Sequence, residues 1–243
     1  MFSHGNGWSM DGYEPLVDRW AAAGFVVVQP THLDSRRHGI GFDNPIFGTI
    51  WRVRIADLHA VLDNLDDILA RAAGLDARID HDQVAVVGHS WGAQTAGTLL
   101  GARVLDSDGN AGEDFTHAAV KAGVLIAATG TGDTLTPFAA EHLPFMRPDY
   151  SAMSTPTLVI AGGKDQSAMS TRGPDWFTDA YHFSPGAKSL LTIATDENPA
   201  RVALVADAVS AYLLDTFDHD YARWAGLSAT AAVGDEAFSV DDK

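Results

Sequence analysis

The stretch of this sequence that most constrains its fold is residues 83–100, QVAVVGHSWGAQTAGTLL. Its first part, Val84–Val87, is a short apolar run rich in valine, the pattern of a strand buried on both faces. Its last part, Ala93–Leu100, has small and apolar residues at helical spacing. A strand that becomes a helix within a few residues crowds its own backbone, so the flanking residues must lack a Cβ and the residue at the apex is strained and exposed. In the turn Gly88-His89-Ser90-Trp91-Gly92, that residue is Ser90.

A Gly-x-Ser-x-Gly turn between a strand and a helix indicates a nucleophile elbow, which presents the serine side chain to a substrate. The alternative is an ordinary glycine-rich turn with a solvated serine. A serine hydroxyl needs a base, an acid that orients the base, and donors for the oxyanion. The expected donors are the backbone N–H groups of Trp91, which follows the nucleophile, and of Asn6, in the loop after the first strand. The alternative for that loop, His4–Gly7, is a plain turn.

The best candidate for the orienting acid is Asp165. It follows the predicted strand Thr157–Ala161, and it comes after the nucleophile, as the chain order Ser, Asp, His of this type of site requires. The alternative role for Asp165 is an N-cap of the segment after it. Asp133, in the loop after the preceding strand, is the second candidate for the acid.

Strands alternate with helices along the chain, which predicts a mostly parallel sheet with helices on both faces. The length fits a single domain, 1–243, in which residues 215–243 are expected to form a loosely packed C-terminal tail. The first residues read as the end of a strand, so N-terminal strands are expected to be missing, and the exposed sheet edge favours a homodimer. The other predicted strands are Phe25–Gln29, Val120–Ala127 and Ser189–Ile193, and the predicted helices are Tyr13–Ala23, Ile50–Ala73 and Pro199–Leu214.

The composition argues against several classes of partner. The formal charge is −16, from 32 acidic residues against 16 Lys and Arg, and such a surface repels phosphate backbones and anionic lipids. We therefore expect no nucleic-acid and no membrane partner. The chain has no cysteine and no histidines at metal-ligand spacing, so no metal site is expected. Without a signal peptide the sequence predicts a cytoplasmic protein, while the abrupt start leaves open that an export signal was lost.

Several segments carry a family resemblance: FSHG at 2–5, VVVQP at 26–30 followed by HLDS at 32–35, VVGHSWG at 86–92, TPTLVIAG at 155–162 and KD at 164–165. On these residues the chain resembles the α/β-hydrolase superfamily. Within it the chain looks like the branch of dienelactone hydrolases, chlorophyllases and platelet-activating-factor acetylhydrolases, which includes bacterial polyester-degrading esterases. The resemblance implies the three-layer α/β-hydrolase fold, Ser90 as nucleophile, Asp165 as acid, no cofactor, and small or polymeric carboxylic esters as substrates.

The catalytic histidine is unknown from the sequence. Members of the superfamily carry it in the loop after the last strand, and here that loop, Ala194–Pro199, has no histidine. His182 precedes the last strand and His219 follows the final helix, so both are expected far from Ser90. His89 is expected to point into packing. The histidines on loops at the functional edge, for which bracing the loop is the favoured role, are His4, His32 and His142.

Two functions are consistent with this pattern. The leading one is a serine-type carboxylic-ester hydrolase that forms an acyl-enzyme on Ser90. The second is a catalytically impaired or inactive protein with the α/β-hydrolase fold, which the missing histidine favours. Aromatic residues near the site could line an acyl pocket, and Trp91 is the strongest candidate because the elbow fixes its position. The other candidates are Trp8, Phe47, Trp51, Phe138 and Phe145.

Overall fold

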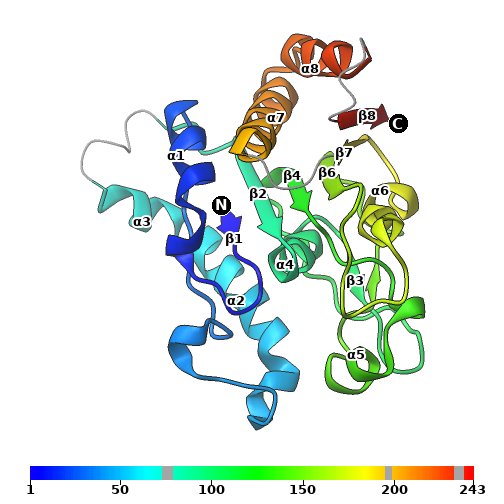
Figure 1. The fold of residues 1–243 in the computed structure, drawn as a ribbon. Coiled ribbons are helices and arrows are strands. Elements are labelled where there is room, and N and C mark those ends of the chain that lie inside the picture. Colours follow the sequence, from blue (N-terminus) through cyan, green and yellow to red (C-terminus); the bar gives the residue numbers. More distant parts are fainter. Residues whose placement is uncertain (73–78, 195–198, 233–237) are drawn as a thin grey trace.

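The computed structural model describes residues 1–72, 79–194, 199–232 and 238–243. In this part of the chain a six-stranded sheet has the order β1-β2-β4-β6-β7-β8 (Figure 1). All neighbouring strands run parallel except β8, which runs antiparallel to β7. The strands are β1 (Phe2–Ser3), β2 (Val84–His89), β4 (Val120–Ile126), β6 (Thr157–Gly162), β7 (Lys188–Ile193) and β8 (Phe238–Asp242).

One face of the sheet is covered by α2 (Ile50–Asp63), α4 (Trp91–Leu99) and α6 (Asp179–Phe183). Helix α4 follows β2 directly and is buried along its whole length. Its alanine, glycine and threonine side chains are small enough for the helix to approach the strands closely. Helix α2 packs Ile55, Leu58 and Leu62 into the same apolar cluster. Because α4 begins directly after Ser90, the turn that carries Ser90 connects the sheet to this helix layer.

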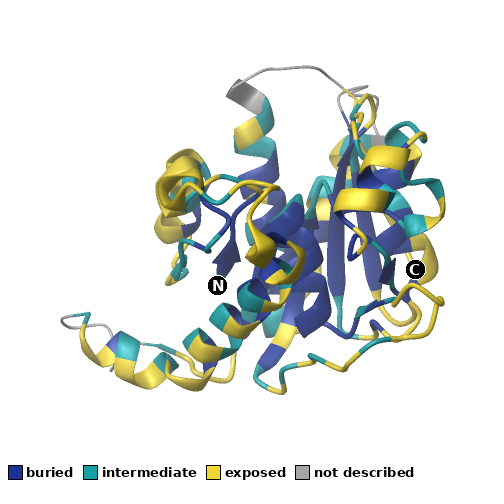
Figure 2. Cartoon of the chain, turned by 90° about the horizontal axis from the view of Figure 1, so that it is seen from below, coloured by how far each residue is buried: buried dark blue, intermediate teal, exposed yellow. Residues whose placement is uncertain are grey.

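The other face is covered by α1 (Glu14–Ala22), α7 (Pro199–Asp218) and α8 (Ala222–Ala232). Their apolar residues form a second cluster with the opposite side chains of the strands. Figure 2 shows the strands between the two helix layers coloured almost entirely as buried. The predicted fold class, a three-layer α/β-hydrolase fold with a mostly parallel sheet, is confirmed. None of the helices in the described ranges combines the length and the apolar character needed to cross a membrane.

Smaller elements complete the fold. Strands β3 (Arg103–Val104) and β5 (Pro148–Asp149) form a separate antiparallel pair. Helix α5 (Pro137–His142) follows β4 along the chain, and α3 (Leu65–Ala70) follows α2. Short 3₁₀ turns span Met10–Tyr13, Arg36–His38, Pro45–Thr49, Gly132–Thr134 and Pro174–Thr178.

The long helix predicted over Ile50–Ala73 is wrong as one continuous element. It breaks at Asn64, whose backbone angles of φ −116° and ψ 22° end α2 before α3 begins. The Asn64 side chain donates to the Ala60 carbonyl at 2.8 Å. Such a local bond competes with the helical ladder, which is why asparagine is common at helix ends. Residue 73, the last of the predicted helix, lies outside the described residues.

The strand predicted over Phe25–Gln29 is also wrong. The segment belongs to no strand and is half-buried to exposed along its length. Its link to the sheet is a bond from the Phe2 N–H to the Val28 carbonyl at 2.9 Å. The neighbouring strand β1 has only two residues, so it offers the segment almost no hydrogen-bond ladder. A run of valines indicates a preference for extended backbone, but the pairing depends on the neighbour.

The loose tail predicted for residues 215–243 is not what the described residues show. Helix α7 continues to Asp218, and α8 and β8 follow it. Trp224 and Phe238 are buried in the cluster beneath them. The buried carboxylate of Asp215 accepts the N–H of Trp224 at 2.7 Å, which fixes the start of α8. Most of this segment is therefore an integral part of the outer helix layer and the sheet edge.

Candidate active site

Ser90 stands at the apex of the turn between β2 and α4. Its backbone has φ 54° and ψ −119°, outside the regions that residues with a Cβ normally adopt. A Cβ at Gly88 would lie 2.0 Å from the Gly92 carbonyl oxygen, and a Cβ at Gly92 would lie 2.0 Å from the Ser3 carbonyl oxygen. Only glycine fits at either position. The turn therefore has the crowded backbone expected from the sequence, with a half-buried serine at its apex.

The loop His4–Gly7 begins beside this turn, since Gly92 leaves no room between α4 and the backbone of β1. The Gly5 N–H donates to the Tyr13 hydroxyl at 2.9 Å. The Gly7 N–H donates to Asp34 Oδ2 at 3.2 Å. These two bonds hold the loop on either side of its exposed residue, Asn6.

The backbone N–H groups of Asn6 and Trp91 have no acceptor among the residues that the structure describes. Trp91 is the first residue of α4, where the partial positive charge of the helix N-terminus adds to the N–H dipole. Two unpaired donors near a half-buried serine are suited to hold a developing oxyanion. The arrangement is compatible with the role that the sequence predicts for both residues.

Asp165 lies in the turn that follows β6. Its Oδ2 accepts the N–H of Gly162 at 3.0 Å, and its Oδ1 lies 3.4 Å from Nη2 of Arg201. No helix begins at Asp165, so its alternative role as an N-cap does not apply. The second candidate for the acid, Asp133, is exposed and accepts the hydroxyl of Thr131.

A cavity of about 310 Å³ lies beside Asp165 and His89, at the carboxyl ends of β2, β4, β6 and β7. Tyr13 and Arg201 also line it, with apolar residues behind them. The pKa of His89 is lowered, because the effect of burial is larger than the opposing effect of the Asp165 carboxylate. Asp165 therefore lines the same cavity as His89, the residue before Ser90. Asp133 does not line this cavity.

Ser90 Oγ has no hydrogen bond to an imidazole of the described residues. His4 and His32 are fully buried in loop contacts, in agreement with the bracing role favoured from the sequence. His142 is exposed and stacks on Phe138. His182 and His219, which the sequence predicts to lie far from Ser90, are both exposed. Residues 195–198 of the loop after β7 lie outside the described residues.

The sequence of residues 1–241 matches the alpha/beta hydrolase family. The chain belongs to this family. No curated protein matches it at a significant level. Membership supports a hydrolase in general, and the order of strand, turn and helix around Ser90 is the part of this hydrolase fold that carries a nucleophile.

A second serine, histidine and aspartate of the hydrolase are joined by hydrogen bonds. Ser3 Oγ lies 2.9 Å from His32 Nε2, and His32 Nδ1 lies 2.8 Å from Asp57 Oδ2. Ser3 and His32 are completely buried, so no substrate can reach the hydroxyl. Burial, with smaller contributions from Arg54 and His4, lowers the pKa of His32 to about 2. His32 is therefore neutral, and these three residues form a structural network and not a catalytic triad.

A buried ion pair next to this network was not identified from the sequence. Arg54 Nη1 donates to Asp34 Oδ1 at 2.6 Å, and both side chains are almost fully excluded from solvent. Arg54 lies on the apolar side of α2, four residues from Ile50 and four from Leu58. The sequence signal for this ion pair was an arginine inside an apolar stripe, since charged residues are rarely buried without a partner.

The aromatic residues near the site fall into two groups. Trp91 packs against Phe47 and Phe145, with ring centroids 5.8 and 5.2 Å apart, and Trp51 stacks on Phe145. These rings belong to a core cluster beneath the site. Phe138 and Trp8 are instead about half exposed, at 45% and 48%. Phe42 lies between the groups, in contact with Phe47 and Phe138.

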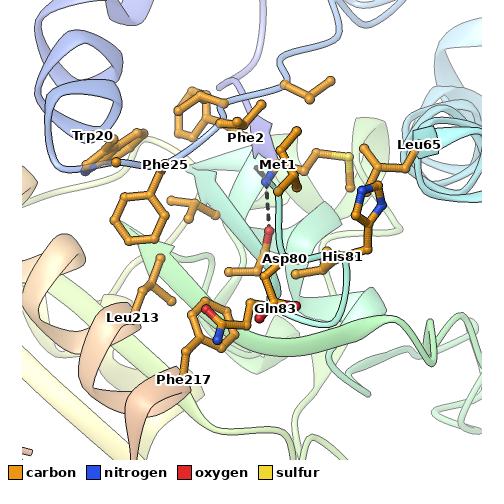
Figure 3. A pocket seen from close by; sticks show the side chains of 18 of the residues that line it. Met1, Phe2, Trp20, Phe25, Leu65, Asp80, His81, Gln83, Leu213 and Phe217 are labelled. Carbon is orange, nitrogen blue, oxygen red and sulfur yellow. Dashed lines mark hydrogen bonds between the residues drawn. The ribbon is translucent and has the colours of Figure 1, made fainter. Parts of the chain in front are cut away.

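Another cavity, of about 320 Å³, does not include Ser90 in its lining, and Figure 3 shows residues that surround it. Trp20, Phe25 and Leu213 line one side of it, and Leu65 and His81 lie opposite them. Its lining is mostly apolar and contains none of the candidate site residues. Within the described ranges, no three His, Asp or Glu side chains are grouped as metal ligands would be.

Proposed function

We propose that this hydrolase cleaves carboxylic esters through an acyl-enzyme on Ser90. The observation that carries the proposal is the strained backbone of Ser90, at φ 54°, directly before the unpaired N–H of Trp91. Residues adopt such conformations at a cost of about 1–3 kcal/mol, and they cluster at active sites.

The proposed reaction proceeds in two steps. Ser90 Oγ attacks the ester carbonyl carbon, its proton passes to a base, and the carbonyl oxygen becomes an oxyanion held by the N–H groups of Trp91 and Asn6. The carbon–oxygen bond to the alcohol then breaks, and the alcohol leaves with a proton from the base. Water attacks the acyl-enzyme in the same way and releases the acid. Asp165 would orient a base placed in the cavity that it lines, and the identity of that base is not assigned.

The proposed substrates are small or polymeric carboxylic esters, as in the dienelactone-hydrolase and chlorophyllase-like branch that the chain resembles. The exposed rings of Phe42 and Phe138, 5.7 Å apart, continue outward from the rings packed around Trp91. An apolar acyl group, or a segment of a polyester, could lie along them. We expect esters with apolar acyl groups to be better substrates than esters with charged ones.

A second candidate function is a binding protein that keeps the hydrolase fold but is catalytically impaired. The observation that favours it is the Ser90 hydroxyl, which contacts no imidazole in the part of the chain that the structure describes. Removing a triad member typically lowers the rate by several orders of magnitude, and the oxyanion donors alone leave only a weak enhancement.

Fluorophosphonate labelling together with p-nitrophenyl butyrate turnover separates the two candidates. Labelling of Ser90 and turnover, both lost in Ser90→Ala, would support the ester hydrolase. Absence of both in a folded native protein would support the impaired protein, because a serine without a base reacts very slowly with the phosphonate as well as with the ester. The matched control is Ser151→Ala, an exposed serine whose loss should change neither readout. A folded native protein with no labelling at all would refute a reactive Ser90.

A further inference from the structure

The guanidinium of Arg54 contacts both backbone segments that carry the two unpaired amides. On the first segment, Nη2 donates to the carbonyl oxygen of His4, two residues before Asn6. On the second, Nε donates to Thr95 Oγ1 at 3.1 Å, and Thr95 Oγ1 donates to the Trp91 carbonyl at 2.9 Å. One side chain of α2 therefore spans the gap between the loop after β1 and the first turn of α4.

The partner of Arg54 extends this contact to the far side of Asn6. Asp34 binds Arg54 through Oδ1 at 2.6 Å and accepts the Gly7 N–H through Oδ2 at 3.2 Å. The two residues before and after the Gly5–Asn6 peptide are thus tied to the same ion pair. The Asn6 amide is held in place from both sides without using its own N–H.

We propose that Arg54 is the positioning residue of the oxyanion hole, fixing the Asn6 and Trp91 amides relative to each other. The proposal rests on the ester-hydrolase function proposed above. Arg54 does not touch the substrate and acts through the backbone. Its planar guanidinium offers donors in a fixed fork, so it can bind four acceptors at once, namely Asp34 Oδ1, Thr95 Oγ1, Ser3 Oγ and the His4 carbonyl oxygen. A lysine ammonium on a flexible stem cannot do this equally well.

The burial of Arg54 argues for such a role. Taking an ion pair out of water is expensive, and packed apolar residues of similar volume often stabilise a fold as well or better. Arg54 and Asp34 have side chains exposed by only 1% and 0%. The hydrogen bonds of this pair reach the loop His4–Gly7 and Thr95 of α4, which are the two segments that the oxyanion would contact. Apolar packing cannot fix two backbone segments in such a defined geometry. A displacement of about 1 Å in such donors is enough to lower a rate on the order of 100-fold.

Arg54→Lys tests the proposal, because it keeps a cation for Asp34 and removes the fork. We expect the second-order rate of fluorophosphonate labelling to fall on the order of 10- to 100-fold. For p-nitrophenyl butyrate, kcat should fall by a similar factor while KM changes by less than about 2-fold, since a transition-state contact is lost. The control is Arg52→Lys on the same helix, an exposed residue paired with Glu113, which should alter each value by less than about 2-fold.

Hydrogen exchange gives a readout that does not need activity. In Arg54→Lys, exchange of the amides in residues 4–8 and 91–94 should be faster by at least about 10-fold, with β4 and β6 unchanged. If the variant does not fold, Asp34→Asn takes its place, since it keeps an acceptor for Gly7 but removes the charge. Native labelling and native exchange in a folded variant would overturn the proposal. Absence of labelling in the native protein would defeat the ester-hydrolase function instead, and the exchange result would still decide the role of Arg54.

Discussion

The phenol hydroxyl of Tyr13 lies 2.8 Å from Nδ1 of His89, the residue before the proposed nucleophile. The Gly5 N–H donates to the same hydroxyl. Burial raises the pKa of Tyr13, so the hydroxyl keeps its proton and donates it to Nδ1, the acceptor within reach among the described residues. His89 then carries its own proton on Nε2. In this form Nδ1 accepts the Tyr13 proton and Nε2 carries a proton, so neither ring nitrogen is free to act as a base.

Tyr13→Phe should therefore loosen the loop next to the elbow. The substitution leaves the Gly5 N–H without an acceptor, and we expect the free energy of unfolding to fall by about 1–2 kcal/mol. Fluorophosphonate labelling of Ser90 should slow by about 3- to 10-fold, because the neighbouring Asn6 amide is less well placed. Urea unfolding and labelling kinetics measure the two effects. Tyr221→Phe, at an exposed tyrosine, is the control, and equal behaviour of the two variants would contradict the role of Tyr13.

Exogenous imidazole should restore a base to the cavity beside Asp165. The cavity of about 310 Å³ opens between Asp165 and the residue next to Ser90, and it can admit an imidazole ring. We expect turnover of p-nitrophenyl butyrate to rise at least about 10-fold at saturating imidazole, below the roughly 100- to 10,000-fold of a built-in base. Ser90→Ala measures the background reaction of imidazole with the ester. Asp165→Asn should remove the effect and Asp133→Asn should keep it, so rescue that survives loss of Asp165 would refute its role as the orienting acid.

Gly92→Ala should disrupt the elbow. The added Cβ would meet the Ser3 carbonyl oxygen at 2.0 Å, and a backbone atom cannot move aside as a side chain does. We expect a loss of at least about 1–3 kcal/mol in the free energy of unfolding, with labelling of Ser90 abolished. Gly226→Ala in α8 is the matched control, because a Cβ there meets nothing within 4 Å. That control should gain up to about 1 kcal/mol from helix propensity.

Acid should destabilise the fold through His32. Its pKa is about 2 in the folded protein and 6.5 in the unfolded chain, so the unfolded state binds more protons between these values. Stability is then fully present above pH 6.5 and is lost as the pH falls through this window, by up to about 1.4 kcal/mol per pH unit from this group. Urea unfolding between pH 7 and about pH 5 gives the slope. His32→Gln should reduce the slope, and an unchanged slope would show that His32 is not the group responsible.

We propose a homodimer at the β1 edge of the sheet, as expected from the sequence. Beyond β1 the extended segment that contains Val26 and Val28 makes one backbone bond to the sheet, and Val26 is 38% exposed. Edges of this kind pair readily with a second copy. Light scattering should give the mass of a dimer, and Val26→Lys should shift it toward the monomer. A monodisperse monomer of the native protein would contradict this pairing.

The parts of the fold that local pattern determines could be predicted. The strand and helix on either side of Ser90 follow from the valine run, the small residues and the two glycines, all within about twenty residues of sequence. The place of Asp165, directly after the β6 segment, could also be predicted. Strand β8 could not be predicted, because Phe238–Asp242 is short and charged. This strand is stabilised by pairing with β7, which is distant in the sequence.

The contacts of the site itself were harder to predict than its residues. Asp34 and Arg54 are twenty positions apart, and their contacts with each other and with the loop His4–Gly7 depend on how α2 packs across the sheet. The same holds for Tyr13 and His89, which are brought together by the approach of α1 to the end of β2. Sequence patterns identify which groups can react, whereas the supports of those groups come from tertiary packing.

The antiparallel course of β8 has a practical consequence. Because β8 reverses direction along β7, Lys243 pairs with Lys188 at the amino end of that strand. Ser90 follows the carboxyl end of β2, which runs parallel to β7 through β4 and β6. Attaching the protein to a bead or a sensor chip through residue 243 would thus leave the serine facing the solution, ready for solid or polymeric material presented from the opposite side.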